Sequence, residues 1–180
     1  MKARSLLVNL RTLEPGRSTF EDAERVAKLM SATPSGFVPC NHVYCEWVSQ
    51  IDNSKIPRWW RGRGETFGGV IRVKDSTVEL IGAGFTIGVL GKESVDRSAG
   101  FQEQENWGRR NLPVPIAAGW SSSDVYLYRH FGVYMTTKAS AEDKRRYAAF
   151  NFNCFWKYKG CADGRELMPI STTYRAEYPR

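Results

Sequence analysis

The sequence predicts an α+β fold: an antiparallel sheet of four or five strands with two helices packed on one face. Strand-like segments follow one another as hairpins instead of alternating with helices, which favours antiparallel pairing. Two other segments combine acidic residues at their start with hydrophobic residues at helical spacing. A length of 180 residues and a hydrophobic share of 42% suit a single domain, residues 1–180, with its own core.

The first 51 residues are expected to form a strand, a helix and a second strand. Residues 5–13 (SLLVNLRTL) alternate loosely between hydrophobic and polar, which is typical of a strand. Ser18 and Glu21 have the spacing of a capping box and begin the helix TFEDAERVAKLM. Residues 43–51 (VYCEWVSQI) contain β-branched and aromatic residues and predict the next strand.

Residues 67–90 predict a long hairpin with its turn at 74–76, because both arms carry β-branched residues. The glycines Gly82, Gly84 and Gly88 in the second arm predict bends or bulges. They also give this arm a superficial likeness to a dinucleotide-binding fingerprint. That fingerprint needs a helix after its turn, whereas strand-forming residues follow here, so strand glycines are the preferred interpretation.

Residues 91–123 are rich in Gly, Pro, Gln and Asn and have no periodic pattern. They predict a long irregular loop before the last strand, either functional or mobile. Residues 124–136 (DVYLYRHFGVYMT) alternate clearly and form that strand. A second helix is expected to begin after Ser140 and to end at Gly160, and residues 170–180 to form a C-terminal tail.

The charge of +7 and the pI near 9.4 favour anionic partners such as nucleic acid or acidic lipid. The basic residues are spread along the chain, which also suits a mildly cationic, solvated surface. No stretch approaches the roughly 20 apolar residues of a membrane-spanning helix, and residues 6–10 are too short for a signal peptide. If the protein works outside the cytoplasm, we expect its leader or anchor to be absent from this chain.

Four cysteines occur as two local pairs, which favours two disulfides, Cys40–Cys45 and Cys154–Cys161, among the three possible pairings. In an unbroken helix the second pair would be about 10 Å apart, too far for a disulfide. A left-handed cap at Gly160 would bring Cys161 back toward Cys154.

Metal or thiol chemistry is the alternative for these cysteines. The C-x4-C and C-x6-C spacings are wider than usual zinc knuckles, although His42 lies inside the first pair and could join them. A catalytic thiol could use His42 or His130, but the sequence supplies neither an oxyanion loop nor an orienting acid. We therefore predict neither a metal nor a cofactor.

Aromatic and basic residues alternate in three segments, RWWRGRG, NWGRR and KYK (Lys157–Lys159). Tryptophan with arginine can bind a partner protein, stack on bases or lie at a lipid interface. The plainer alternative is that the tryptophans are buried and the arginines solvated. The residues predicted to bind a partner are Arg58, Trp59, Trp60, Arg61, Arg63, Trp107, Arg109 and Arg110.

The ending AAFNFNCFWKYKGCADGRELMP resembles that of a group of uncharacterised bacterial proteins with the approximate pattern A-F-N-x-x-C-L…G-C-x-D-A-x-E-L-L-P. Phe155, Gly164 and Met168 depart from the pattern conservatively. The residues that match it are Ala149, Phe150, Asn151, Cys154, Gly160, Cys161, Asp163, Glu166, Leu167 and Pro169. LLVNLRTLEPGRSTFEDAE and the PC….CEW segment are also similar, so the resemblance covers about a third of the chain. It implies a membrane-tethered protein whose bulk lies outside the cytoplasm, and it implies no catalytic residue.

These observations point to a non-catalytic, extracytoplasmic (periplasmic or membrane-associated) binding or accessory subunit that docks on a partner protein or membrane complex. The first alternative is an anion-binding module for nucleic acid or acidic glycans. The second is a hydrolytic enzyme using His130, with Tyr126, Tyr128 and Tyr134 on the same strand face. A concave pocket over that face would favour the enzyme. No motif identifies a small-molecule substrate.

Overall fold

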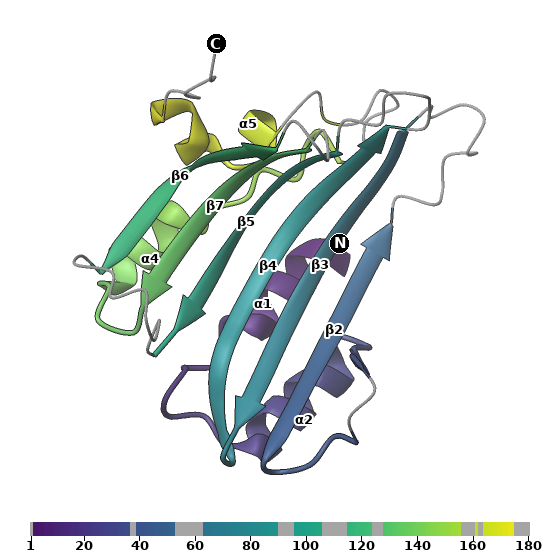
Figure 1. The fold of residues 1–180 in the computed structure, drawn as a ribbon, viewed down its shortest axis with the longest axis vertical. Helices are drawn as coiled ribbons and strands as arrows, with labels where there is room; N and C mark the ends of the chain where they lie inside the picture. The colour runs from purple at the N-terminus through teal and green to yellow at the C-terminus, as the bar shows by residue number, and fades with distance from the viewer. Residues whose placement is uncertain are drawn as a thin grey trace.

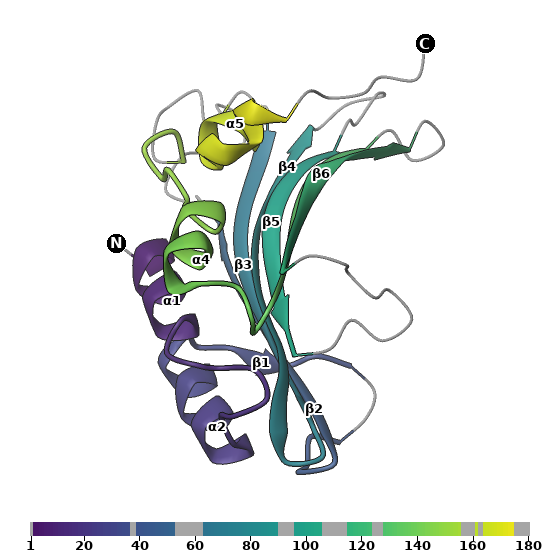
Figure 2. The ribbon, with the colours of Figure 1, turned by 90° about the vertical axis from the view of Figure 1, so that its left-hand side faces the viewer.

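The computed structural model describes residues 2–36, 39–52, 63–89, 96–105, 115–123, 128–155, 161 and 164–174. These form one sheet with helices on one of its faces (Figures 1 and 2). The strands are β1 (Thr33–Pro34), β2 (Tyr44–Asp52), β3 (Arg63–Lys74), β4 (Thr77–Val89), β5 (Asp96–Gln104), β6 (Ile116–Ser123) and β7 (Tyr128–Thr136). The helices are α1 (Lys2–Leu10), α2 (Phe20–Leu29), α4 (Ala141–Tyr147), α5 (Gly164–Leu167) and the 3-10 helix η1 (Pro169–Thr173).

Within the described residues, the sheet has seven strands in the order β1-β2-β3-β4-β5-β7-β6. All neighbouring strands are antiparallel except β5 and β7, which are parallel. The α+β class is confirmed. The predicted antiparallel sheet of four or five strands with two helices is wrong, because the sheet is larger and mixed and four α-helices occur in the described chain.

The predicted irregular loop over residues 91–123 is also wrong, because it contains two strands. β5 joins the edge of β4, and β6 pairs with the far edge of β7. Both strands are poor in β-branched residues, so their strand conformation follows from pairing with neighbours rather than from local propensity.

The chain begins with helix α1, not with the strand predicted over residues 5–13. Ala3, Leu6, Leu7 and Leu10 are all buried, and their spacing of three and four residues is that of one helix face. The loose alternation of hydrophobic and polar residues in this segment also fits a helical period.

The helix α2 and the strands β2, β3 and β4 confirm the predictions for these segments. The capping box at the start of α2 is formed by Thr19 and Asp22, one residue later than expected. The β3–β4 turn places Asp75 and Ser76 at positive φ, 50° and 65°, as a two-residue hairpin turn requires. The register shift in this hairpin lies at Arg72 and Val73, not at the glycines of the second arm.

The C-terminal helical segment is shorter than predicted. Ser140 caps α4, where its side chain accepts a hydrogen bond from the backbone N–H of Asp143. The helix ends at Tyr147, so Cys154 is not part of it. Gly160, the expected helix stop, lies outside the described residues.

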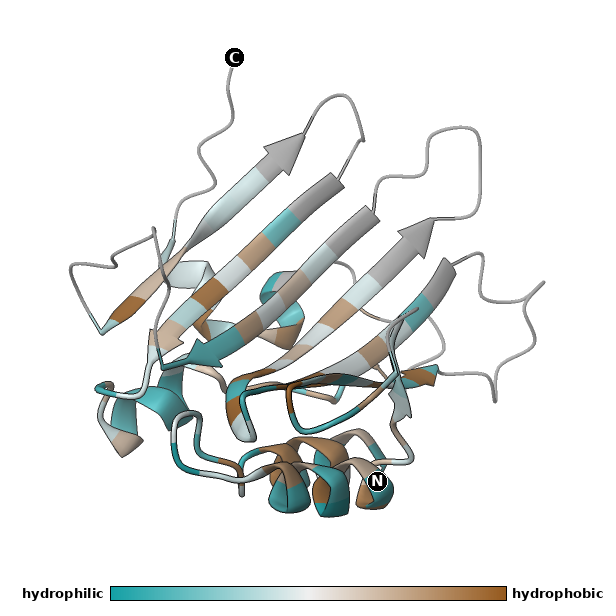
Figure 3. Cartoon of the chain, turned by 60° about the horizontal axis from the view of Figure 1, so that its bottom comes forward, coloured by the Kyte–Doolittle hydropathy of each residue, from teal (hydrophilic) through white to brown (hydrophobic). Residues whose placement is uncertain are grey.

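The two faces of the sheet differ in composition. Helices cover one face, and Figure 3 shows the N-terminal helices with their hydrophobic residues turned toward the sheet. This interface holds the core, whose largest fully buried side chains include Phe67, Phe85, Phe131 and Phe155. The strands bend so that the other face is concave (Figure 2). The concave face carries the candidate site.

Candidate functional site

Five strands place a glycine at the same level on the concave face. Backbone pairing aligns Gly68 with Gly84, Gly84 with Gly100, Gly100 with Gly132, and Gly132 with Gly119. We call these five residues the glycine row. It runs across β3, β4, β5, β7 and β6, perpendicular to the strands, and leaves this part of the sheet without side chains.

The protein's own packing requires glycine at some of these positions. A Cβ atom at Gly100 would lie 2.8 Å from the carbonyl oxygen of Ala83 and 2.9 Å from the Cα of Gly84. At Gly68 a Cβ would lie 3.0 Å from the carbonyl oxygen of Ser49. At these positions glycine allows the close approach of neighbouring backbones in a bent sheet.

Two members of the row have no such requirement. A Cβ at Gly84 would meet its nearest atom at 3.5 Å, an ordinary contact, and a Cβ at Gly119 would meet nothing within 4 Å. Alanine would fit at both positions and would stabilise a strand interior by about 0.5–1 kcal/mol relative to glycine. Packing within the protein therefore does not explain the absence of a side chain at Gly84.

A cavity of about 330 Å³ lies over the glycine row, between β2 and β7. We call it the glycine groove. Its floor includes Gly68, Gly84, Gly100 and Gly132, whereas Gly119 lies on the edge strand β6 outside it. The volume falls in the range of about 300–1,000 Å³ that is usual for small-molecule sites.

One side of the groove is a ladder of polar side chains, which we call the polar rim. It consists of Thr66, Thr86, Ser98 and His130, each paired in register with the next across β3, β4, β5 and β7. Adjacent strands are about 4.8 Å apart, so the rim repeats a hydrogen-bonding group at that interval.

His130 and Ser98 are directly hydrogen-bonded, with 2.8 Å between the Nδ1 atom of the ring and the Oγ atom of the serine. Burial lowers the pKa of His130 below its ordinary value of 6.5. The imidazole is therefore mainly neutral at neutral pH, and it can both donate and accept hydrogen bonds.

The opposite side of the groove is formed by Val48, Val70, Gln102 and Tyr134. The ring of Tyr134 packs close to Gly132. A Cβ atom at Gly132 would lie 2.9 Å from the Cε2 atom of the tyrosine. Among the described residues that line the groove, none is Asp, Glu, Lys or Arg.

An ion pair between Arg72 and Glu46 lies toward the β3–β4 turn, and neither residue lines the groove. Arg72 contacts Glu46 with 2.7 Å between Nη2 and Oε2, and Ser35 donates a hydrogen bond to the same carboxylate. Burial alone would raise the pKa of Glu46, but the hydrogen bonds from Ser35 and Arg72 and the charge of Arg72 outweigh it and lower the pKa. The carboxylate is thus held ionised within this pair.

A second cavity, of about 760 Å³, lies on the helical face beside α4. Several of its charged groups bond within the protein: Lys144 contacts Glu103 at 2.6 Å, and Arg11 donates to the carbonyl oxygen of Ala148 at 2.7 Å. Burial lowers the pKa of Arg11. These contacts tie α4 to β5 and to the end of α1, which indicates a structural role.

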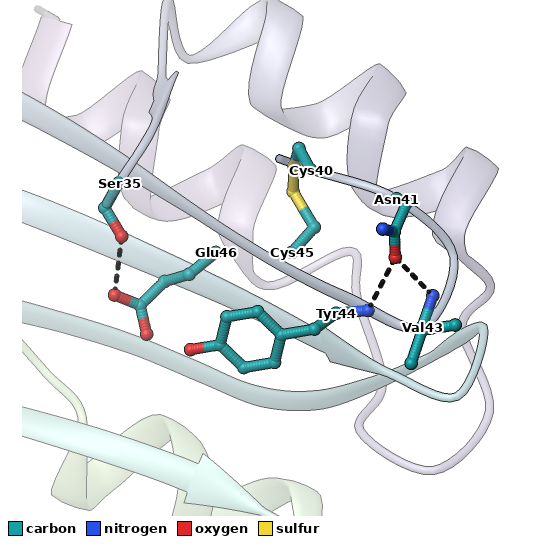
Figure 4. The surroundings of a disulfide bond; sticks show 7 residues. All are labelled: Ser35, Cys40, Asn41, Val43, Tyr44, Cys45 and Glu46. Carbon is teal, nitrogen blue, oxygen red and sulfur yellow. Dashed lines mark hydrogen bonds between the residues drawn. A yellow bond between two sulfur atoms is a disulfide. The ribbon is translucent and has the colours of Figure 1, made fainter. Parts of the chain in front are cut away.

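Both predicted disulfides are confirmed. Cys40 and Cys45 have Cα atoms 4.5 Å apart and join the loop before β2 to that strand (Figure 4). In the same loop, the side chain of Asn41 accepts hydrogen bonds from the backbone N–H groups of Val43 and Tyr44. The disulfide therefore fixes a loop that is already ordered by a local turn.

The second disulfide is buried and faces the core. Cys154 and Cys161 have Cα atoms 4.7 Å apart, and the backbone N–H of Cys161 donates to the buried carboxylate of Glu65 on β3. Glu166 lies near both sulfur atoms. Because the sulfurs are bonded to each other, this group lacks the thiolates that a zinc site would use.

The predicted partner-binding residues fall almost entirely outside the described chain. Arg63 is the first residue of β3, and the other seven lie in the undescribed ranges 53–62 and 106–114. Tyr126 also lies outside the described residues. His130 and Tyr134 share the concave face, as the alternation of residues 124–136 predicted.

The glycine row is not among the features predicted from the sequence, although the sequence contains a signal for it. Each member stands next to an aromatic residue of its own strand. The five dipeptides are Phe67-Gly68, Gly84-Phe85, Gly100-Phe101, Gly119-Trp120 and Phe131-Gly132. Because neighbouring residues of a strand face opposite ways, this repeated pair predicts one face with aromatics and one face without side chains.

Among the described residues, no helix combines the length and apolar character needed to cross a bilayer. Comparison of the chain with models of known protein families, with curated proteins and with solved structures found no match. The resemblance to the group of membrane-tethered bacterial proteins therefore stays a prediction, and the site has to be interpreted from its own geometry.

Proposed function

We propose that this protein binds a small uncharged ligand in the glycine groove. The observation that carries the proposal is the bare floor at Gly84, where the protein's own packing leaves room for a side chain but the sequence provides none. A binding site gains from such a position because a ligand can approach the backbone closely.

The composition of the groove supports an uncharged ligand. The chain carries a net charge of +7, yet the described lining of the groove contains hydroxyl, amide, imidazole and hydrocarbon groups alone. A charged ligand would lose its hydration on entering without meeting an opposite charge, which is costly. A neutral ligand avoids this cost and can hydrogen-bond to the polar rim.

The test is a screen of neutral and anionic fragments. Binding of each fragment is measured by the changes it causes in the backbone amide signals of the protein in NMR spectra. We expect neutral fragments to shift the signals of Gly84, Gly100 and Gly132. Gly84→Val should abolish these shifts, because its side chain would occupy the floor. Gly119→Val is the matched control, since it changes the same glycine row outside the groove. Shifts that are equal in both variants, or that cluster elsewhere, would contradict the proposal.

A second candidate function is hydrolysis, which the contact between Ser98 and His130 favours. A serine hydroxyl hydrogen-bonded to a neutral imidazole inside a pocket is the arrangement of a nucleophile and its general base. A fluorophosphonate probe, which labels activated serines, tests hydrolysis. Labelling that is lost in Ser98→Ala but retained in Thr86→Ala would support this function. Absence of labelling at Ser98 would leave ligand binding as the function.

We also propose that the protein works outside the cytoplasm. The two disulfides support this, because disulfides persist mainly in oxidising compartments. Free thiols in protein isolated from its native cells without reductant would contradict it. Docking on a partner through Trp59 and Trp60 stays a separate prediction, which replacement of both residues by serine and measurement of association with native membranes would test.

A further inference from the structure

The direction of the glycine groove limits the shape of its ligand. The groove crosses from β2 to β7, over four spacings between adjacent strands. At about 4.8 Å for each spacing, this is a length of about 19 Å. A ligand that uses the full length of the groove lies across the strands, along the glycine row.

The polar rim limits the chemistry of the ligand. The hydroxyls of Thr66 and Thr86 can each donate and accept a hydrogen bond, and Ser98 and His130, which are bonded to each other, keep one donor and one acceptor between them. Gln102 on the opposite side adds an amide with the same dual capacity. A regular series of such groups matches a ligand whose own groups donate and accept at repeated intervals, as the hydroxyls of a sugar chain do.

Other elongated ligands fit less well. An extended peptide binds a sheet through backbone hydrogen bonds at an edge strand, whereas the floor here is the face of paired strands. An acyl chain would cover the rim without offering it hydrogen bonds, which is unfavourable for buried hydroxyls. A polyanion would meet no basic side chain among the described lining residues.

We infer that the ligand of the glycine groove is a neutral oligosaccharide that lies along the glycine row, with its hydroxyls bonded to the polar rim. The apolar floor and the ring of Tyr134 contact the C–H faces of its sugar rings. This inference rests on the proposed function and adds the class of ligand to it.

The experiment uses an array of neutral oligomers of glucose, mannose, galactose, xylose and N-acetylglucosamine, with uronic acid oligomers as the anionic comparison. Calorimetry then measures the dissociation constant of the strongest neutral binder at low and moderate salt. We expect a neutral oligosaccharide to bind more tightly than its monosaccharide, and salt to have little effect, whereas binding of a polyanion would weaken strongly.

Three variants locate the binding. Thr86→Val replaces an exposed hydroxyl by a methyl group of similar size and should weaken binding about five- to tenfold, the usual effect of one lost hydrogen bond. Gly84→Val should abolish binding, and Gly119→Val should leave it within about twofold of the original. Equal binding by Gly84→Val and Gly119→Val would overturn the inference, because the sugar would then bind elsewhere.

The array also separates this inference from the proposed function. If neutral fragments bind in the groove but no neutral oligosaccharide does, the inference fails and the proposed function stands. If uronic acid oligomers bind the groove in preference, the inference fails as well. If neither fragments nor oligosaccharides bind there, both fail together.

Discussion

The two faces of the central sheet are built from the same strands but carry different side chains. On the helical face the strands contribute Phe67, Phe85 and Phe131, all fully buried. On the concave face, at the residue adjacent to each of these rings along its strand, the protein has glycine. The helical face thus has its largest side chains where the concave face has none.

This difference separates the residues of the core from those of the proposed site along each strand. Rings such as Phe67 pack edge-on against Phe150 and Phe152, with ring centres 5.2 Å and 4.9 Å apart. Such contacts bury apolar surface and contribute to folding, whereas the glycines of the row have no side chain to bury. The protein can therefore maintain an open floor on one face because the other face supplies the core.

The largest expected effect is on the helical face. Phe67→Ala should lower the free energy of unfolding by about 3–5 kcal/mol, because it removes a fully buried ring and leaves a cavity. Chemical denaturation measures this. Thr66→Ala, one residue earlier on the opposite face, is the matched control and should change the free energy of unfolding by less than about 1 kcal/mol. Similar losses in both variants would remove the distinction between the faces.

A smaller effect is expected within the glycine row itself. Gly100→Val should destabilise the protein by about 1–3 kcal/mol, because its side chain would collide with the backbone of β4. Gly84→Ala, on that neighbouring strand, should be neutral or stabilising by up to about 1 kcal/mol. Comparison of thermal unfolding for the two variants would show which glycines the bend requires. A large loss for Gly84→Ala would mean that packing, not a ligand, explains the bare floor.

The smallest effect concerns His130 and pH. Burial lowers its pKa below 6.5, so below that pH the unfolded chain binds more protons than the folded chain. The contribution of His130 to stability is therefore present above 6.5 and declines as the pH falls from there toward the lower pKa of the folded state. An NMR titration of the imidazole checks the direction of the pKa shift. In His130→Gln, the unfolding free energy should fall less as the pH decreases below 6.5. A measured pKa at or above 6.5 would contradict this.

The sequence was sufficient to predict the elements whose local signals agree with the fold. The hairpin of β3 and β4 has strand-forming arms and a suitable turn, and both disulfides join cysteines that are close in sequence. Ser140 was recognised as a helix cap because its side chain acts within one turn. Each of these features depends on residues within a short distance along the chain.

The features that were missed depend on pairing between distant segments. β5 and β6 contain Gly, Ala, Ser and Gln, so their composition indicates a loop, and their neighbours determine their conformation. The glycine groove requires the register of every strand from β2 to β7. The five glycine-aromatic dipeptides were visible, but only the strand pairing shows that they align.

The parallel pairing of β5 with β7 has a consequence for how the protein folds. β6 and β7 form a hairpin of their own, and β2 to β5 follow one another as antiparallel neighbours. These two parts meet where β5 pairs with β7, which we call the seam. The paired residues Ser98 and His130 are 32 positions apart in the sequence. We expect pairing across this seam to form slowly, because bringing the two segments together costs loop-closure entropy before their contacts are gained. Since the groove floor crosses the seam between Gly100 and Gly132, we expect the site to exist only after the two parts have joined. Binding would then report completed assembly of the sheet, and a partly folded chain would not compete for the ligand.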